Sequence, residues 1–312
     1  MIFIYILIIF TLFIILGISA DVTVNNIKKI ASTLKLKLFT FGIILGIITT
    51  LPEIFLGINA TFDNIASVSI GNLLGGIIIL FGLVLGLILI LNNKIKTDDR
   101  FDLILPQLLV IFSPILLGLD GVYNLLDGLI MVGLYVGLIL YLYKSNKSLE
   151  KIPNEKILFH KTHLTKAIIF SILGISTILI SSHWIIEYTL KILNSVKVEQ
   201  ILLGTIIFAI GTNLPEITIA FTSWLKKSSE LSLSHILSSA FTNIFVLGIL
   251  SIIKPIFFTI NTHFLLLILF LTIFLILFLI FYHSEKKLDR KEGVIFVVTY
   301  IIFLIVTLYS GK

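Results

Sequence analysis

The 312-residue sequence contains no cysteine, and only 13% of its residues are charged. The absence of cysteine excludes disulfides and thiolate metal sites, which leaves oxygen ligands as the natural chemistry of a metal site. The low charge content, beside 58% hydrophobic residues, excludes an ordinary soluble domain. We therefore expect an all-α polytopic membrane protein whose surroundings are the lipid bilayer.

Motifs of enzymes are also missing from the sequence. It has no Gly-rich phosphate loop, no Ser/His/Asp arrangement and no HExxH motif, so we expect neither an enzyme nor a bound cofactor. No basic residue precedes the first apolar run, which argues against a cleaved signal peptide. The net charge of +6 is compatible with nucleic-acid binding, but the lysines fall between apolar runs rather than along an aromatic stripe. We therefore expect no nucleic-acid partner.

Apolar runs of about 20 residues, the length needed to cross a bilayer, predict ten transmembrane helices. They lie near residues 2–20, 38–58, 68–91, 103–119, 125–143, 164–183, 200–224, 232–253, 262–282 and 293–309. The polar stretch 144–163 separates five spans in residues 1–143 from five in residues 164–312. We interpret it as a cytoplasmic linker between two units.

Basic residues test this arrangement, because cytoplasmic loops are enriched in them. With the N-terminus outside, eighteen lysines and arginines fall in the inner loops and only four in the outer segments. The asymmetry predicts a multi-pass protein of the cell membrane with both termini on the extracytoplasmic side.

The two halves share a short motif, "TTLPE" at 49–53 and "TNLPE" at 212–216. A shift of 163 residues superimposes the threonine, leucine, proline and glutamate of one copy on those of the other. Because each unit has an odd number of spans, the second copy enters the membrane upside down. The sequence thus predicts two inverted five-helix repeats whose interrupted helices meet at mid-membrane.

Each proline removes an amide donor, which we expect to loosen the helix around Ile48 and Gly211 and to free carbonyl oxygens there. Glu53 and Glu216 each lie in a span without a basic residue, so that their natural partner is a cation or a proton. Together with the hydroxyls of Thr49, Thr50 and Thr212, they form an all-oxygen site suited to Ca²⁺ or Na⁺. The competing interpretation is a simple kink with a protonated glutamate, which two matched copies make less attractive.

The fragments "AIGTNLPEI" and "SIGNLLGG" resemble the motifs of the sodium/calcium exchanger family, within the cation/Ca²⁺ antiporter superfamily. The resemblance implies ten helices in two inverted repeats, with Glu53 and Glu216 as central acidic ligands. It also implies that further oxygens come from Thr49, Thr50, Thr212, Asn213, Ser239 and Asn243, of which Thr50 and Asn213 stand where the family usually has serine.

The first repeat departs from the family pattern, because Gly76 replaces a serine, Leu80 replaces a polar ligand and Ile48 replaces a glycine. The resemblance implies a secondary antiporter that exchanges a divalent cation, Ca²⁺ by preference, for Na⁺ or H⁺ by alternating access. The missing oxygens keep open a second hypothesis, an exchanger-like scaffold or sensor without transport.

Four other polar residues have two interpretations each. Asn72 serves either helix packing or ion coordination, and His235 is either a proton-coupling group or a wetted residue at a helix start. Asp120 and Asp127 either attract cations or belong to a solvated turn.

Overall fold

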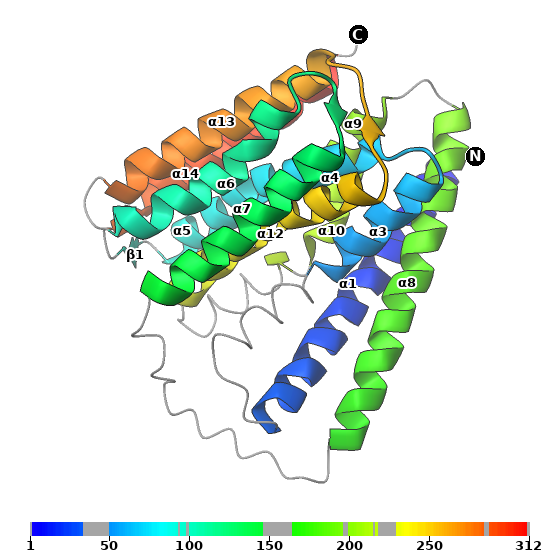
Figure 1. Ribbon diagram of the computed structural model, residues 1–312, viewed down its shortest axis with the longest axis horizontal. Coiled ribbons are helices and arrows are strands. Elements are labelled where there is room, and N and C mark those ends of the chain that lie inside the picture. Colours follow the sequence, from blue (N-terminus) through cyan, green and yellow to red (C-terminus); the bar gives the residue numbers. More distant parts are fainter. Residues whose placement is uncertain are drawn as a thin grey trace.

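The computed structural model describes residues 2–33, 50–92, 94–97, 100–145, 164–195, 199–214, 216–217, 229–283 and 287–310. These residues form a helical bundle with two very short sheets (Figure 1). The elements of the first half are α1 (Ile2–Thr33), α3 (Leu51–Phe62), α4 (Ser67–Ile79), the π-helix η1 (Leu80–Leu85), α5 (Gly86–Asn92), β1 (Lys94–Lys96), α6 (Phe101–Leu117), β2 (Val122–Tyr123) and α7 (Leu125–Ser145). Those of the second half are α8 (Leu164–Ser195), α9 (Gln200–Leu203), the π-helix η4 (Gly204–Phe208), α10 (Ala209–Thr212), α12 (Ser229–Ile253), β3 (Ile256–Phe257), α13 (Thr262–His283), β4 (Lys287–Asp289) and α14 (Arg290–Tyr309).

Seven helices in the described ranges are long and apolar enough to cross a membrane, and two shorter apolar helices cover Phe101–Leu117 and Gln200–Thr212. The protein is therefore an all-helical, multi-pass membrane protein. The expected spans at 38–58 and 200–224, and most of the expected linker at 144–163, fall partly or wholly outside the described residues. The count of ten helices stays a prediction.

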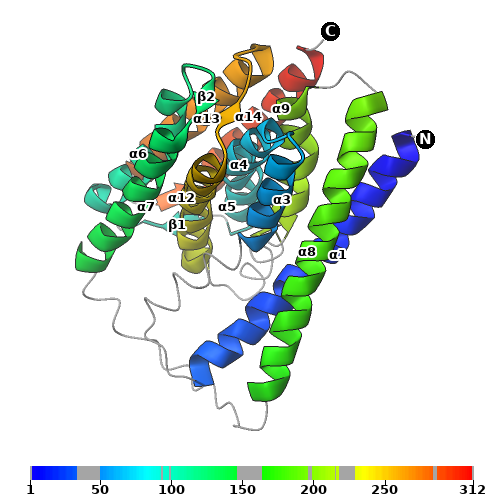
Figure 2. The ribbon, with the colours of Figure 1, turned by 45° about the vertical axis from the view of Figure 1, so that its right-hand side comes forward.

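Two helices are longer than their apolar runs predict. α1 continues to Thr33 instead of ending near residue 20, and α8 continues to Ser195 instead of ending near residue 183. Polar side chains inside the extension of α1 bond to its own backbone, as Thr23 Oγ1 donates to the Ser19 carbonyl and Asn26 Nδ2 to the Val22 carbonyl, both at 2.8 Å. α1 and α8 also pack along each other as a slanted pair beside the rest of the bundle (Figure 2).

α4 lies at the centre of the molecule, where every residue from Val68 to Ile79 is buried. It packs against the α9–η4–α10 segment and also against α3, α12 and α13. A helix that is apolar all round is expected in such a place. Polar residues on α4 are therefore held by protein on all sides, which matters for Asn72.

The two small sheets each join one strand from the first half to one from the second. β1 pairs antiparallel with β4, with Ile95 opposite Leu288, and β2 pairs antiparallel with β3, with Tyr123 opposite Ile256. Because α6 and α13 each run from one sheet to the other, the sheets lie at opposite ends of the bundle (Figure 1). The halves are thus connected at both ends by an exchange of strands.

Candidate cation site

The site forms where α4 crosses the α9–η4–α10 segment at very short range. A Cβ atom added at Gly71 would overlap the carbonyl oxygen of Ile201, and one added at Gly204 would overlap that of Val68. Glycine at both positions allows the two backbones to touch, as small residues do in membrane interfaces. The crossing places the α4 residues Asn72 and Gly76 beside Thr212 and Asn213.

A turn precedes the glutamate in both copies of the motif, with nearly the same backbone geometry. Thr50 has φ −94° and ψ 9°, and Asn213 has φ −85° and ψ 7°, a sparsely populated region that is common in functional sites. Their carbonyl oxygens accept hydrogen bonds from the amides of Ile54 and Ile217, both at 3.0 Å. The motif copies therefore share a backbone conformation as well as a sequence.

The described part of each motif shows where its helix begins or ends. Pro52 is the second residue of α3, where a missing amide donor costs little. Gly211 is helical within α10, and the break comes two residues later at Asn213. Ile48, Thr49 and Pro215 lie outside the described residues.

The two carboxylates are the central feature of the site. Glu53 and Glu216 are each only 2% exposed, and they lie close enough to act on each other electrostatically. One oxygen of each, Oε2, has no hydrogen-bond partner in the described part of the chain, and no basic side chain there forms an ion pair with either. Two buried acceptors without donors are suited to a cation or to protons.

Buried hydroxyls occur at three of the positions that the sequence singled out. The Thr212 hydroxyl interacts with the Glu53 carboxyl and donates to Asn72 Oδ1 at 3.0 Å. Ser239 is 3% exposed, and its hydroxyl has no partner among the described residues. Thr50 is also buried.

Two asparagines complete the polar set. Asn213 Nδ2 donates to the Ala209 carbonyl at 2.8 Å, and Asn243 Nδ2 donates to the Leu73 carbonyl at 3.2 Å. Both side chains are 2% exposed.

At the two departures in α4, Gly76 contributes no side chain and Leu80 is fully buried in the apolar core, where it begins η1. Candidate oxygen ligands are therefore present on α3, α10 and α12 but scarce toward the C-terminal end of α4.

The sodium/calcium exchanger protein family matches this chain over residues 4–144 and 166–309. The chain belongs to this family. An uncharacterised membrane protein of Methanocaldococcus jannaschii, MJ0091, is 24% identical over 288 residues, which cover 91% of each chain. The sodium/calcium exchanger MaX1 of Methanosarcina acetivorans is 23% identical, with 93% of this chain and 95% of the relative covered. The putative antiporter CaxA of Alkalimonas amylolytica is 26% identical over 78% of this chain and 81% of its own.

The fold of this exchanger-family chain is also that of a solved exchanger. The sodium-calcium exchanger NCX_Mj superposes with a TM-score of 0.67 over 98% of this chain and 99% of that one, at 23% sequence identity. Members of the family are transporters rather than enzymes.

One acidic residue of this family member was missed in the sequence. Asp21, on α1, acts electrostatically on Glu216. The same face of α1 reaches the motif one turn earlier, where a Cβ added at Gly17 would lie 3.6 Å from Cβ of Leu214. The first span expected from the sequence ends at residue 20, just before Asp21, whereas α1 continues past it. The feature of the sequence that could have identified Asp21 is that it is the single acidic residue of the segment that forms α1.

The other candidates lie away from these carboxylates. Asp127 caps the start of α7 by accepting from the Asn124 amide at 2.9 Å, and Asp120 accepts from the Val122 amide at 3.2 Å. Both bonds favour a structural role in this turn. Asn72 lies in the site, bonded to Thr212, and the side chain of His235 lies outside the described part.

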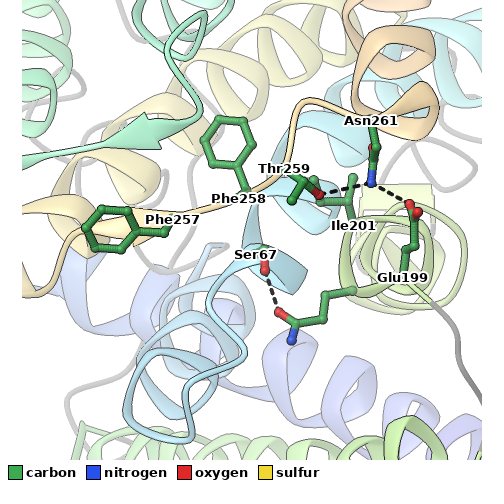
Figure 3. A pocket seen from close by; sticks show the side chains of 8 residues that line it. Ser67, Glu199, Ile201, Phe257, Phe258, Thr259 and Asn261 are labelled. Carbon is green, nitrogen blue, oxygen red and sulfur yellow. Dashed lines mark hydrogen bonds between the residues drawn. The ribbon is translucent and has the colours of Figure 1, made fainter.

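A separate pocket of about 480 Å³ lies at the start of α4 and α9 (Figure 3). In it Asn261 donates to a Glu199 carboxylate oxygen, and Ser67 bonds to Gln200. Ser67 begins α4, the helix that carries Asn72 deeper in the molecule. The pocket thus lies at the N-terminal end of the central helix α4, whereas η1 follows its C-terminal end.

Proposed function

We propose that this exchanger-family protein is a secondary antiporter that exchanges a divalent cation, Ca²⁺ by preference, for Na⁺ or H⁺. The observation that carries the proposal is the pair Glu53 and Glu216, buried together, each with an unpartnered oxygen and without a basic neighbour among the described residues. Burying two such charges costs several kcal/mol unless a cation or protons neutralise them. Hard oxygen ligands of this kind suit Ca²⁺ and Na⁺.

The ligands that we assign are Glu53, Glu216, Thr49, Thr50, Thr212, Asn213, Ser239 and Asn243. Relatives support the assignment of substrate, since one is named a sodium/calcium exchanger and another a putative antiporter. We infer that the site exposes its ions alternately to the two sides of the membrane, as sites at the interface of inverted repeats do in many secondary transporters.

The architecture that we propose for this cycle is two inverted five-helix repeats, residues 1–143 and 164–312, joined by the cytoplasmic linker 144–163. Three observations support it: the separate family matches in the two halves, the equal turns at Thr50 and Asn213, and the exchanged strand pairs. A shift of 163 residues moves β1 close to the position of β3 and β2 close to the position of β4. The β1–β4 pair of one repeat arrangement therefore corresponds to the β2–β3 pair of the other. Such an axis places the binding site at the interface of the repeats.

We place both termini of the chain outside the cell membrane. The distribution of basic residues supports this orientation, and the marked ends of the chain lie toward the same end of the bundle (Figure 2). The pocket of Figure 3 then faces the outer aqueous phase.

Uptake of ⁴⁵Ca²⁺ into proteoliposomes containing the full chain tests the function. We expect uptake when an outward Na⁺ or H⁺ gradient is imposed, and none in protein-free vesicles or without a gradient. If no divalent ion moves under either gradient, the antiporter hypothesis is wrong.

The second hypothesis, an exchanger-like scaffold or sensor, is favoured by Gly76 and Leu80, which offer no side-chain oxygen. It predicts cation-dependent thermal stabilisation of the purified protein without gradient-driven flux. The same preparation therefore separates the two hypotheses.

A further inference from the structure

Two of the departures from the family pattern are neighbours in space. Gly76 stands where the family has serine, and Asn213 replaces the other family serine beside the motif's threonine. A Cβ atom added at Gly76 would lie 2.9 Å from Nδ2 of Asn213 and 3.1 Å from Nδ2 of Asn243. The smaller residue on α4 therefore leaves the space that the larger amide side chains occupy.

The orientation of both amides follows from their partners. The carbonyl oxygens of Ala209 and Leu73 can only accept, so the group of each asparagine that faces them is the NH₂. Each amide oxygen is consequently directed away from its backbone partner, and no hydrogen bond to either oxygen is formed by the described residues. Two neutral oxygens are thereby held by buried side chains beside Gly76.

We propose that Gly76 is a positioning residue of the cation site, because its missing side chain leaves room for the amides of Asn213 and Asn243, whose oxygens replace the cation ligands that residues 76 and 80 do not offer. The inference rests on the proposed function. Because the amides are the ends of side chains, a serine at 76 displaces them without breaking the backbone crossing. It breaks the Asn213–Ala209 and Asn243–Leu73 hydrogen bonds and so misdirects the oxygens. The change therefore affects cation binding more than folding.

A double-mutant cycle on the full-length protein tests this coupling. The variants are Gly76→Ser, Asn213→Ser and the double variant, and the matched control is Gly137→Ser, at an α7 glycine where an added Cβ meets nothing within 4 Å. Thermal unfolding is measured in chelator and across a Ca²⁺ titration, since a ligand that binds the native state raises the unfolding temperature. We expect each single site variant to weaken the apparent Kd at least about tenfold, about 1.4 kcal/mol.

In the double variant the serine at 213 no longer meets the serine at 76, while Asn243 is still displaced. We therefore expect the apparent Kd of the double variant to be weakened at least about tenfold less than the product of the two single effects, a coupling of about 1.4 kcal/mol. Gly137→Ser keeps the wild-type Kd. The inference is wrong if Gly76→Ser binds Ca²⁺ as the wild type does, or if the effects of the two single changes simply add.

Failure of the proposed function has a different signature. Wild-type protein would then show no gradient-driven flux. If Ca²⁺, Na⁺ and Sr²⁺ also fail to stabilise it, the assignment of the amide oxygens as ligands is overturned as well. Additive effects in a wild type that does bind cations overturn only the inference about Gly76.

Discussion

At the scale of single residues, Glu53 and Glu216 set the chemistry of the protein. Each is buried, and their mutual repulsion adds to the cost of removing them from water. Threonine and serine hydroxyls around them can donate at most one hydrogen each, which is too few to satisfy two carboxylates. A bound cation would neutralise the two charges and coordinate the carboxylate oxygens that accept no hydrogen bond.

We therefore expect Glu53→Gln and Glu216→Gln each to weaken the apparent Kd for Ca²⁺, measured by thermal unfolding, by more than about tenfold. Each change should also abolish flux. Each change removes one charge from a two-charge site of low dielectric, where Coulomb interactions are strong. The control is Glu187→Gln, which loses a half-exposed ion pair with Lys191 at 2.9 Å and should leave binding unchanged. Full activity in either site variant would mean that the ion binds elsewhere.

The sequence made these two residues predictable because carboxylates are rare in apolar spans and the motif occurs twice. It did not make Asp21 predictable as a neighbour of Glu216, because that depends on how far α1 extends. Nor did it relate Gly76 to Asn213, since their contact arises only from the packing of α4 against α10.

At the scale of elements, the crossing of α4 with η4 holds the site together. Gly71 packs against the carbonyl oxygen of Ile201, and Gly204 packs against that of Val68. A larger residue at either position would therefore force the two helices apart. η4 is a π-helix, a type of segment that is frequent at functional sites. The crossing therefore couples the packing of the two halves to the geometry of the ligands.

We expect Gly204→Ala to destabilise the protein by about 1–3 kcal/mol or more, the usual cost of overpacking. Gly133→Ala is its control, because an added Cβ there meets nothing within 4 Å and alanine favours a helix. Thermal unfolding in chelator measures both. Equal unfolding temperatures for Gly204→Ala and the wild type would show that the helices separate readily at this crossing.

Apolar runs predicted most helices correctly, since a lipid-facing segment needs internal hydrogen bonds throughout. They failed at the ends of α1 and α8. There, polar side chains such as Thr23, Asn26 and Thr189 bond to the carbonyl four residues earlier and remain compatible with a helix. Hydropathy counts such residues as breaks, although the helix satisfies them itself.

At the scale of the whole molecule, the two halves are bound at both ends by the β1–β4 and β2–β3 pairs. The buried core of one half is also continued by the other, as α14 packs on α5 and η1 while α12 packs on α7. The long pair α1 and α8 lies to one side of this core (Figure 2). Pairing across the halves was not predictable from single-span patterns, because it depends on contacts between residues far apart in sequence.

The charge of the site decides how the whole cycle responds to membrane voltage. Within the ligand set that we assign, only Glu53 and Glu216 carry formal charge, because Asn243 is neutral and Leu80 lies in the apolar core. One Ca²⁺ balances two negative charges, as do two Na⁺ or two protons. A third Na⁺ would leave an uncompensated positive charge where oxygen ligands are scarce.

We therefore predict electroneutral exchange in the wild-type protein. Uptake of ⁴⁵Ca²⁺ at potentials set with K⁺ and valinomycin should have the same rate and endpoint at every voltage, whereas one net charge per cycle would shift the driving force by about 2.3 kcal/mol per 100 mV. A shift of that size contradicts the two-charge count, and Asp21, which acts on Glu216, is then the residue to add to it. In that event Asp21→Asn should make the exchange independent of voltage. If voltage has no effect, replacing the Na⁺ gradient with a pH gradient in the same vesicles distinguishes two sodium ions from two protons as the counter-transported charge.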